Sequence, residues 1–181
     1  MHLSPVALFV YNRPDHTRRT VESLLNNALA NETTLFVYCD GAKCKEDEHS
    51  VEQVRQYISS VSGFKNITVV NRTENFGLAR SIVDGVGNVL KDHESLIVLE
   101  DDIETSSCFL RYMNEALNMY KEEENVWQVT GYNYPINEVI DESTFFFRGN
   151  SCWGWGTWRD RWTSYKKDIK QLEDTFSKED I

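Results

Sequence analysis

Three observations in the sequence predict an α/β protein with a mostly parallel central sheet flanked by helices. Short apolar runs rich in β-branched and aromatic residues recur along the first hundred residues, which is typical of strands buried on both faces. Stretches with apolar residues at helical spacing separate these runs, so strand and helix alternate four times. Polar residues follow each run directly, at the carboxyl ends of the strands, where parallel sheets bind ligands.

The elements are expected in the following order. Four strands are expected over residues 6–11, 35–39, 67–70 and 96–99. Helices are expected between and after them, over about 15–26, 51–58, 76–90 and 106–117. Asp15 is the expected cap of the first helix, which follows the break at Asn12-Arg13-Pro14. Residues 126–130 and 144–147 are expected to form further strands, and the chain beyond the aromatic segment is charged and helix-like.

Composition limits the classes of function. The chain has 181 residues, 40% hydrophobic and 27% charged, which suits one globular α/β domain. The net charge of −10 argues against nucleic acid as a partner, because phosphate backbones need a basic surface. The apolar run near the N-terminus is too short to span a membrane and lacks the features of a signal peptide. We therefore expect a cytoplasmic protein without a transmembrane segment.

An acidic triplet, Glu100-Asp101-Asp102, directly follows the most hydrophobic of the expected strands. Three adjacent carboxylates repel one another unless a cation compensates their charge. Oxygen ligands suit Mg²⁺ or Mn²⁺, and such ions usually complete their coordination with water and substrate phosphates. The alternative is a solvated acidic turn that also caps the next helix. The position after residues 96–99 favours the metal site.

Residues at the other strand ends are candidate contacts for a nucleotide. Arg13 and Arg80 are candidates for phosphate pairing, because a guanidinium offers a fork of donors, and a surface ion pair is the alternative for each. Asp40 is either an ordinary turn residue or an acceptor for a base or ribose that lies across the strand ends. The run Asn75-Phe76-Gly77 either begins a helix or packs beside the ligand.

The segment Ser151-Cys-Trp-Gly-Trp-Gly-Thr-Trp158 interleaves three tryptophans with two glycines. The glycines favour a loop, and aromatic faces stack on sugar rings. Trp153, Gly154 and Trp155 are therefore candidate contacts for a sugar, and an aromatic core is the alternative. The four histidines show no metal-ligand spacing, and the four cysteines lack the paired spacing of a zinc site.

Taken together, these motifs resemble those of GT-A-fold glycosyltransferases of the large family 2 type, in particular the group related to N-acetylglucosaminyltransferase I. The matching segments, in the family's order and spacing, are residues 5–14, 38–41, 71–80 and 98–103. The acidic triplet is similar to that group's Glu-Asp-Asp version of the Asp-x-Asp metal motif. The resemblance implies a Rossmann-like GT-A fold, a UDP-sugar donor, Mn²⁺ or Mg²⁺, and transfer to an acceptor hydroxyl with inversion.

Carried onto this chain residue by residue, the resemblance implies a nucleotide pocket at the strand ends. Tyr11, Asn12 and Arg13 would line the pocket, and Asp40 would face the uracil. The other residues expected at the nucleotide-sugar are Gly77, Arg80, Glu100 and Asp101. Asp102 would be the direct metal ligand, with Asp101 beside the ribose or the metal. Trp153, Gly154 and Trp155 would lie below the donor sugar and the acceptor.

The general base that an inverting enzyme needs is not evident in this sequence. In the related enzymes it is an acidic residue downstream of the aromatic segment. Asp160 is the nearby candidate, although we expect it to lie on a helix and the base to follow Ile181. We therefore expect one domain over residues 1–181, truncated at the C-terminus, with a nucleotide-binding half (1–104) and an acceptor-side half (105–181).

The sequence thus predicts a glycosyltransferase that moves a sugar from a UDP-sugar to a hydroxyl of a glycan or lipid-linked glycan. A role in surface glycan or polysaccharide synthesis is expected, at the inner face of the membrane if the protein is peripheral. One alternative is a metal-dependent sugar nucleotidyltransferase, which would carry a Gly-rich cationic loop after the first strand that this chain lacks. The other is a GT-A-like binding module without catalytic activity.

Overall fold

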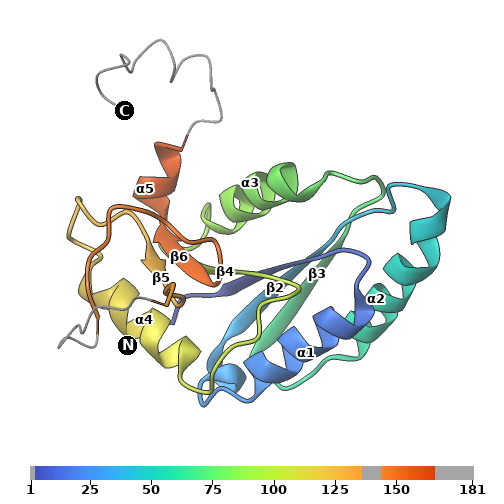
Figure 1. The fold of residues 1–181 in the computed structure, drawn as a ribbon, viewed down its shortest axis with the longest axis horizontal. Helices are drawn as coiled ribbons and strands as arrows, with labels where there is room; N and C mark the ends of the chain where they lie inside the picture. Colours follow the sequence, from blue (N-terminus) through green and yellow to red (C-terminus); the bar gives the residue numbers. More distant parts are fainter. Residues whose placement is uncertain (1–2, 136–143, 166–181) are drawn as a thin grey trace, which may run out of the picture.

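The computed structural model describes residues 3–135 and 144–165, and a six-stranded sheet forms its centre (Figure 1). The sheet order is β3-β2-β1-β4-β6-β5. The strands are β1 (Val6–Val10), β2 (Thr34–Cys39), β3 (Asn66–Asn71), β4 (Ser95–Glu100), β5 (Val129–Thr130) and β6 (Trp155–Trp158). The first four are parallel, and β6 runs antiparallel to both β4 and β5. The predicted α/β fold with a mostly parallel sheet is confirmed.

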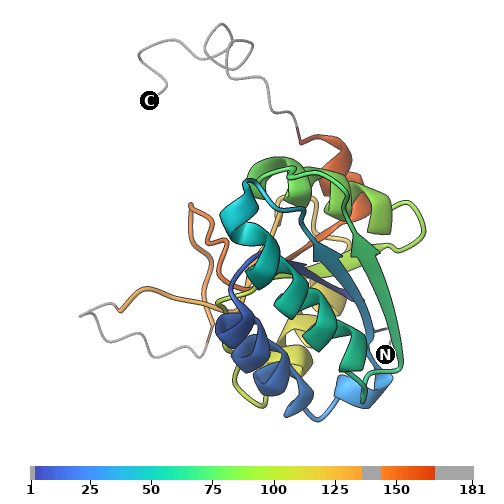
Figure 2. The same ribbon diagram turned by 90° about the vertical axis from the view of Figure 1, so that its right-hand side faces the viewer.

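Helices cover both faces of the sheet (Figure 1). They are α1 (Pro14–Leu25), α2 (Glu48–Ser60), α3 (Leu78–Val89), α4 (Phe109–Met119) and α5 (Arg159–Thr163), with short 3₁₀ turns at Ala30–Glu32 and Lys45–Asp47. Apolar side chains of α1, α2 and α4 pack with one face of β1, β2 and β4 in the larger core. Side chains of α3 and α5 pack on the opposite face in a smaller one. Figure 2 shows α1 and α2 side by side, with β3 at the edge of the sheet.

The parallel register brings the carboxyl ends of the strands to one edge. Val10 is paired with Cys39, Cys39 with Asn71, and Phe9 with Glu100. The residues that follow β1, β2, β3 and β4 therefore emerge next to one another. These are the polar residues that the sequence marked as candidates for ligand binding.

Two local expectations are wrong. Asp15 does not cap the first helix, because α1 begins one residue earlier, at Pro14, and Arg13 is the N-cap residue without a side-chain capping bond. Proline suits the first helical position, since its fixed φ is helical and its missing N–H would have no partner there. Residues 144–147 form no strand, and Phe146 and Phe147 are largely exposed to solvent.

The aromatic segment, expected as a loop, contributes the strand β6. Gly156 makes this possible, because a Cβ at this position would lie 3.0 Å from the carbonyl oxygen of Leu96 and 3.1–3.2 Å from the side chains of Leu117 and Met113. A glycine inside a strand often marks such a close approach of a neighbouring backbone. The pleat then directs Trp155 to the core under α3 and α5, and Trp158 to the core under α4.

Candidate functional site

Arg13 bridges two members of the acidic triplet. Its Nη2 donates a hydrogen bond to Oδ1 of Asp101, and its Nη1 donates to Oδ2 of Asp102 at 3.1 Å. The two carboxylates differ in environment, because the Asp101 side chain is 4% exposed and that of Asp102 is 40% exposed. The fork of Arg13 thus joins one buried and one solvent-facing carboxylate.

Asp101 is fixed on several sides. The backbone N–H of Tyr11 donates to its Oδ2 at 3.3 Å, and the hydroxyl of Thr20 donates to its carbonyl oxygen at 2.9 Å. Burial raises the pKa of Asp101, and the charge and hydrogen bond of Arg13 oppose that rise. Glu100, at the end of β4, is half-buried, and its pKa is raised by burial and then by the charges of Asp102 and Asp101.

Asp102 is the member of the triplet that is placed to bind a cation from solvent. In the described part of the chain, no group of three or more His, Cys, Asp or Glu side chains could hold a metal ion by itself. A divalent cation at Asp102 would therefore take its remaining ligands from water and from a substrate. This donor set suits Mg²⁺ or Mn²⁺, which usually bind through one or two carboxylates together with phosphate oxygens.

Asp40, which follows β2, is buried, and its carboxylate accepts four hydrogen bonds. Its Oδ1 accepts from the backbone N–H groups of Gly41 at 3.0 Å and Phe76 at 2.8 Å. Its Oδ2 accepts from the N–H of Gly77 at 3.0 Å and from Nδ2 of Asn75 at 3.3 Å. The structure thus places Asp40 as the residue that fixes the loop over residues 75–77 to the end of β2.

Two arginines lie over the ring of Phe76. The guanidinium carbon of Arg72 is 4.0 Å from the ring centroid and that of Arg80 is 3.8 Å from it. Arg72 is buried and pairs with Asp84 at 3.0 Å, whereas Arg80 is largely exposed and pairs with Glu74 at 3.5 Å. Arg80 is therefore a cation at this edge that a phosphate can reach.

A hydrogen-bond network around Asp47 extends the site, and no motif in the sequence predicts it. The hydroxyl of Tyr11 donates to Oδ2 of Asp47 at 2.7 Å, and Nδ2 of Asn12 donates to Oδ1 at 2.7 Å. The Tyr11 hydroxyl also accepts from the backbone N–H of Lys43 at 2.9 Å. Burial and the hydrogen bond to Asp47 raise the pKa of Tyr11 to about 12. Asp47 lies in a charged stretch far along the chain, so spacing could not relate it to Tyr11.

A pocket of about 310 Å³ opens beside Asp102. It is lined by residues 102–106 and by Phe109, Gly131, Tyr132 and Trp153. The ring of Trp153, which is 43% exposed, lies 4.6 Å from that of Tyr132 and 5.8 Å from that of Tyr134. Gly154, with a φ of +71°, turns the chain between exposed Trp153 and buried Trp155. The pocket thus joins the acidic strand end to an aromatic cluster, which consists of Tyr132, Tyr134 and Trp153.

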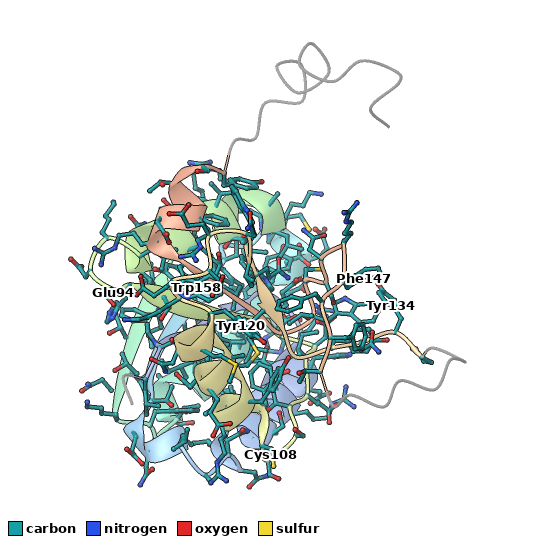
Figure 3. All side chains as sticks on the ribbon, turned by 90° about the vertical axis from the view of Figure 1, so that its left-hand side faces the viewer. Glu94, Cys108, Tyr120, Tyr134, Phe147 and Trp158 are labelled. Carbon is teal, nitrogen blue, oxygen red and sulfur yellow. The ribbon has the colours of Figure 1, made fainter. Side chains whose placement is uncertain are left out.

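Trp155 and Asp160 lie away from this pocket. Trp155 is 9% exposed and packs in the core, 6.0 Å from the ring of Trp162. Because β6 is antiparallel to β4, its end at Trp158 is paired with Ser95, at the start of β4. Figure 3 shows Trp158 beside Glu94 and far from Tyr134.

Asp160 therefore lies roughly 20 Å from the acidic triplet, given about 3.3 Å per residue along β4. It is the second residue of α5, where it forms an ion pair with Arg161 at 2.7 Å. Burial alone would raise the pKa of Asp160, but the hydrogen bonds and charge of Arg161 outweigh it and lower the pKa. The expected helical position is correct, and the placement argues against Asp160 as a base at this site.

The fold and the site define the class of protein. A mostly parallel sheet gathers an acidic strand end, two arginines and an aromatic pocket on one edge, which is the arrangement expected of a GT-A glycosyltransferase. The chain belongs to the GNT-I family, whose family model matches residues 1–167. The resemblance to the N-acetylglucosaminyltransferase I group drawn from the sequence is thereby confirmed.

Solved structures similar to this chain include the following three. Staphylococcus aureus TarS is 17% identical with a TM-score of 0.41, over 65% of this chain and 20% of that chain. A putative nucleotide-diphospho-sugar transferase from Desulfovibrio desulfuricans G20 is 12% identical with a TM-score of 0.42, over 65% of this chain and 55% of that chain. The 4-diphosphocytidyl-2C-methyl-D-erythritol synthase from Anaerococcus prevotii DSM 20548 is 13% identical with a TM-score of 0.45, over 96% of this chain and 82% of that chain. The chain thus spans less than two thirds of the first two proteins.

None of the helices within residues 3–135 and 144–165 combines the length and the apolar character that crossing a bilayer requires.

Proposed function

We propose that this protein transfers a sugar from a nucleoside diphosphate sugar, with UDP as the expected nucleotide, to an acceptor hydroxyl with the help of a divalent cation. The observation that carries the proposal is the solvent-facing carboxylate of Asp102, at the end of a buried strand and at the mouth of a 310 Å³ pocket. The family to which the chain belongs supports the same reading.

Different residues at the strand ends would contact the cation, the phosphates and the nucleoside of the donor. Asp102 would hold Mn²⁺ or Mg²⁺, with Asp101 behind it, and the ion would neutralise charge on the departing diphosphate. Arg13 and Arg80 are the cations available to the phosphate oxygens, because a guanidinium pairs with phosphate through two parallel hydrogen bonds. Tyr11 and Asn12, fixed by Asp47, lie where the nucleoside would rest.

The aromatic cluster offers a surface on which an acceptor or donor sugar could stack in the pocket. Trp153 presents an exposed ring beside Asp102, and sugar rings stack on such faces. Trp155, buried in the core, is better suited to holding β6 in place than to touching a ligand. We therefore assign the sugar contact to Trp153 within the aromatic segment. An inverting mechanism, a glycan or lipid-linked glycan acceptor, and a cytoplasmic location stay predictions.

Calorimetric titration of UDP with and without Mn²⁺ tests the proposal directly. We expect UDP binding that is markedly tighter with Mn²⁺ and that loses this dependence in Asp102→Ala. Asp92→Ala removes an exposed carboxylate elsewhere and serves as the matched control, with binding unchanged. UDP affinity that is the same with and without Mn²⁺ would contradict the metal role. Release of pyrophosphate from a nucleoside triphosphate and a sugar phosphate would indicate a nucleotidyltransferase instead.

A further inference from the structure

Arg13 combines two contacts of unequal strength in one side chain. Within the described residues it is the one cation paired with either Asp101 or Asp102, and it uses a different nitrogen for each. The pair with Asp101 is shielded from water on the carboxylate side, whereas the pair with Asp102 faces solvent on both sides. Solvent-exposed ion pairs contribute little and exchange readily, while a buried carboxylate strongly requires its partner.

Arg13 also holds part of the carboxylate that a cation at Asp102 would use. Its Nη1 lies 3.1 Å from Oδ2 of Asp102, which is hydrogen-bond distance. A divalent ion bound to this carboxylate would lie close to the guanidinium, so the two cations repel each other and compete for the same negative charge. The tether to Asp101, which Tyr11 and Thr20 fix in turn, keeps the displaced guanidinium at the strand ends.

We propose that Arg13 occupies Asp102 until a diphosphate arrives, then exchanges the Asp102 carboxylate for a phosphate oxygen and so couples cation binding to nucleotide binding. The inference rests on the proposed function and adds the regulation of its site. Without nucleotide, Arg13 competes with the cation for Asp102 and weakens the binding of free metal. With nucleotide, the phosphate compensates Arg13, and Asp102 becomes available to the ion.

This exchange makes a thermodynamic prediction. If UDP releases Asp102 for Mn²⁺, then Mn²⁺ must release Arg13 for UDP by the same factor, because coupling between two sites is reciprocal. Arg13 therefore contributes positive cooperativity between the two ligands. An exposed ion pair of ordinary strength corresponds to a factor of about three to five in an equilibrium constant.

Arg13→Lys is the decisive variant, because it keeps the charge and removes the fork. A single ammonium can pair with Asp101 and cannot also reach Asp102 through a second planar nitrogen. We expect Mn²⁺ alone to bind about three- to fivefold more tightly than to the natural protein. We expect UDP alone to bind more weakly, since a lysine held at Asp101 offers no second nitrogen to the phosphate. The coupling factor between Mn²⁺ and UDP should fall accordingly.

Arg18→Lys is the matched control on the same helix. Arg18 lies over the ring of Tyr57, 4.8 Å from its centroid, and contacts no member of the acidic triplet. The affinities of the Arg18→Lys variant for Mn²⁺ and UDP should equal those of the natural protein. Arg13→Gln adds a second test, in which Mn²⁺ alone should bind more tightly still, and thermal unfolding shows whether each variant is folded.

The measurements are Mn²⁺ binding by electron paramagnetic resonance and UDP binding by calorimetry, each with and without the other ligand. Cooperativity in the natural protein that persists unchanged in folded Arg13→Lys would overturn the role of Arg13 and leave the proposed function intact. Weaker binding of Mn²⁺ alone to both Arg13 variants would overturn it as well. Absence of any Mn²⁺-dependent UDP binding in the natural protein would overturn the proposed function together with this inference.

Discussion

The loop over residues 75–77 depends on the charge of Asp40, and Asp40→Asn measures how strongly. Asparagine retains one oxygen, which can still accept from the N–H groups of Gly41 and Phe76. Its new NH₂ group then faces the donors of Gly77 and Asn75. Hydrogen bonds to a charged group contribute about 1.5–3 kcal/mol each, and rotation of the Asn75 amide would recover one only by breaking its 2.8 Å bond to the Gly41 carbonyl. We expect a loss of about 3 kcal/mol in the free energy of unfolding.

Urea denaturation followed by circular dichroism gives this free energy, and hydrogen exchange shows where it is lost. The amides of Phe76 and Gly77 should lose protection before the amides of β2 do, because the loop detaches first. Asp92→Asn makes the same chemical change at an exposed position and should stay within about 0.5 kcal/mol of the natural protein. A loss at Asp40 no larger than that of this control would refute the reasoning and would favour a carboxylate reserved for the ligand.

Three further predictions concern two thiols and a close backbone contact. Burial raises the pKa of Cys39 to about 12, so at pH 8 its thiol should stay protonated and unreactive toward Ellman's reagent until the protein unfolds. The hydrogen bond to Asp47 raises the pKa of the exposed Cys44 thiol. Asp47→Asn should therefore increase the thiolate fraction of Cys44 and its labelling rate at pH 8. An unchanged labelling rate would contradict this hydrogen bond. In Gly41→Ala, the Cβ would lie 2.5–2.9 Å from backbone atoms of Glu74. We therefore expect urea denaturation to show a loss of about 1–3 kcal/mol in the free energy of unfolding. An unchanged free energy of unfolding would show that the loop around Glu74 moves aside easily.

The four parallel strands and the position of the acidic triplet could be predicted because local pattern determines them. Apolar runs of strand length between helical repeats allow few other arrangements, and the carboxyl end of each strand follows from chain direction. The same two facts are enough to predict that Asp102 lies at a strand end near Arg13. Asp101 and Asp102 could not be told apart in the sequence, because their exposure depends on how Tyr11 and Thr20 pack around one of them.

The aromatic segment could not be read correctly from its pattern. Glycines normally weaken strands, so alternating tryptophan and glycine favoured a loop. The strand β6 exists because Gly156 fits against Leu96, a contact between residues 60 positions apart in the sequence. The same non-local pairing turns Trp155 inward and places Asp160 at the far edge of the sheet. Neither outcome follows from spacing alone.

Polar side chains on α1 and just after its end have a consequence for how the pocket can change. Thr20 and Ser23 lie on α1, where Thr20 donates to the Asp101 carbonyl and the Ser23 hydroxyl accepts from the N–H of Thr105 at 2.9 Å. Asn27, which follows the helix, accepts from the N–H of Leu110 at 2.9 Å. The backbone between the acidic triplet and α4 is thus hydrogen-bonded at both ends and near its middle to α1 and the turn that follows it. Under the proposed function, side chains on that stretch could be exchanged to suit a different sugar while the carboxylates stay where they are, so that sugar specificity would diverge without a change in the cation site.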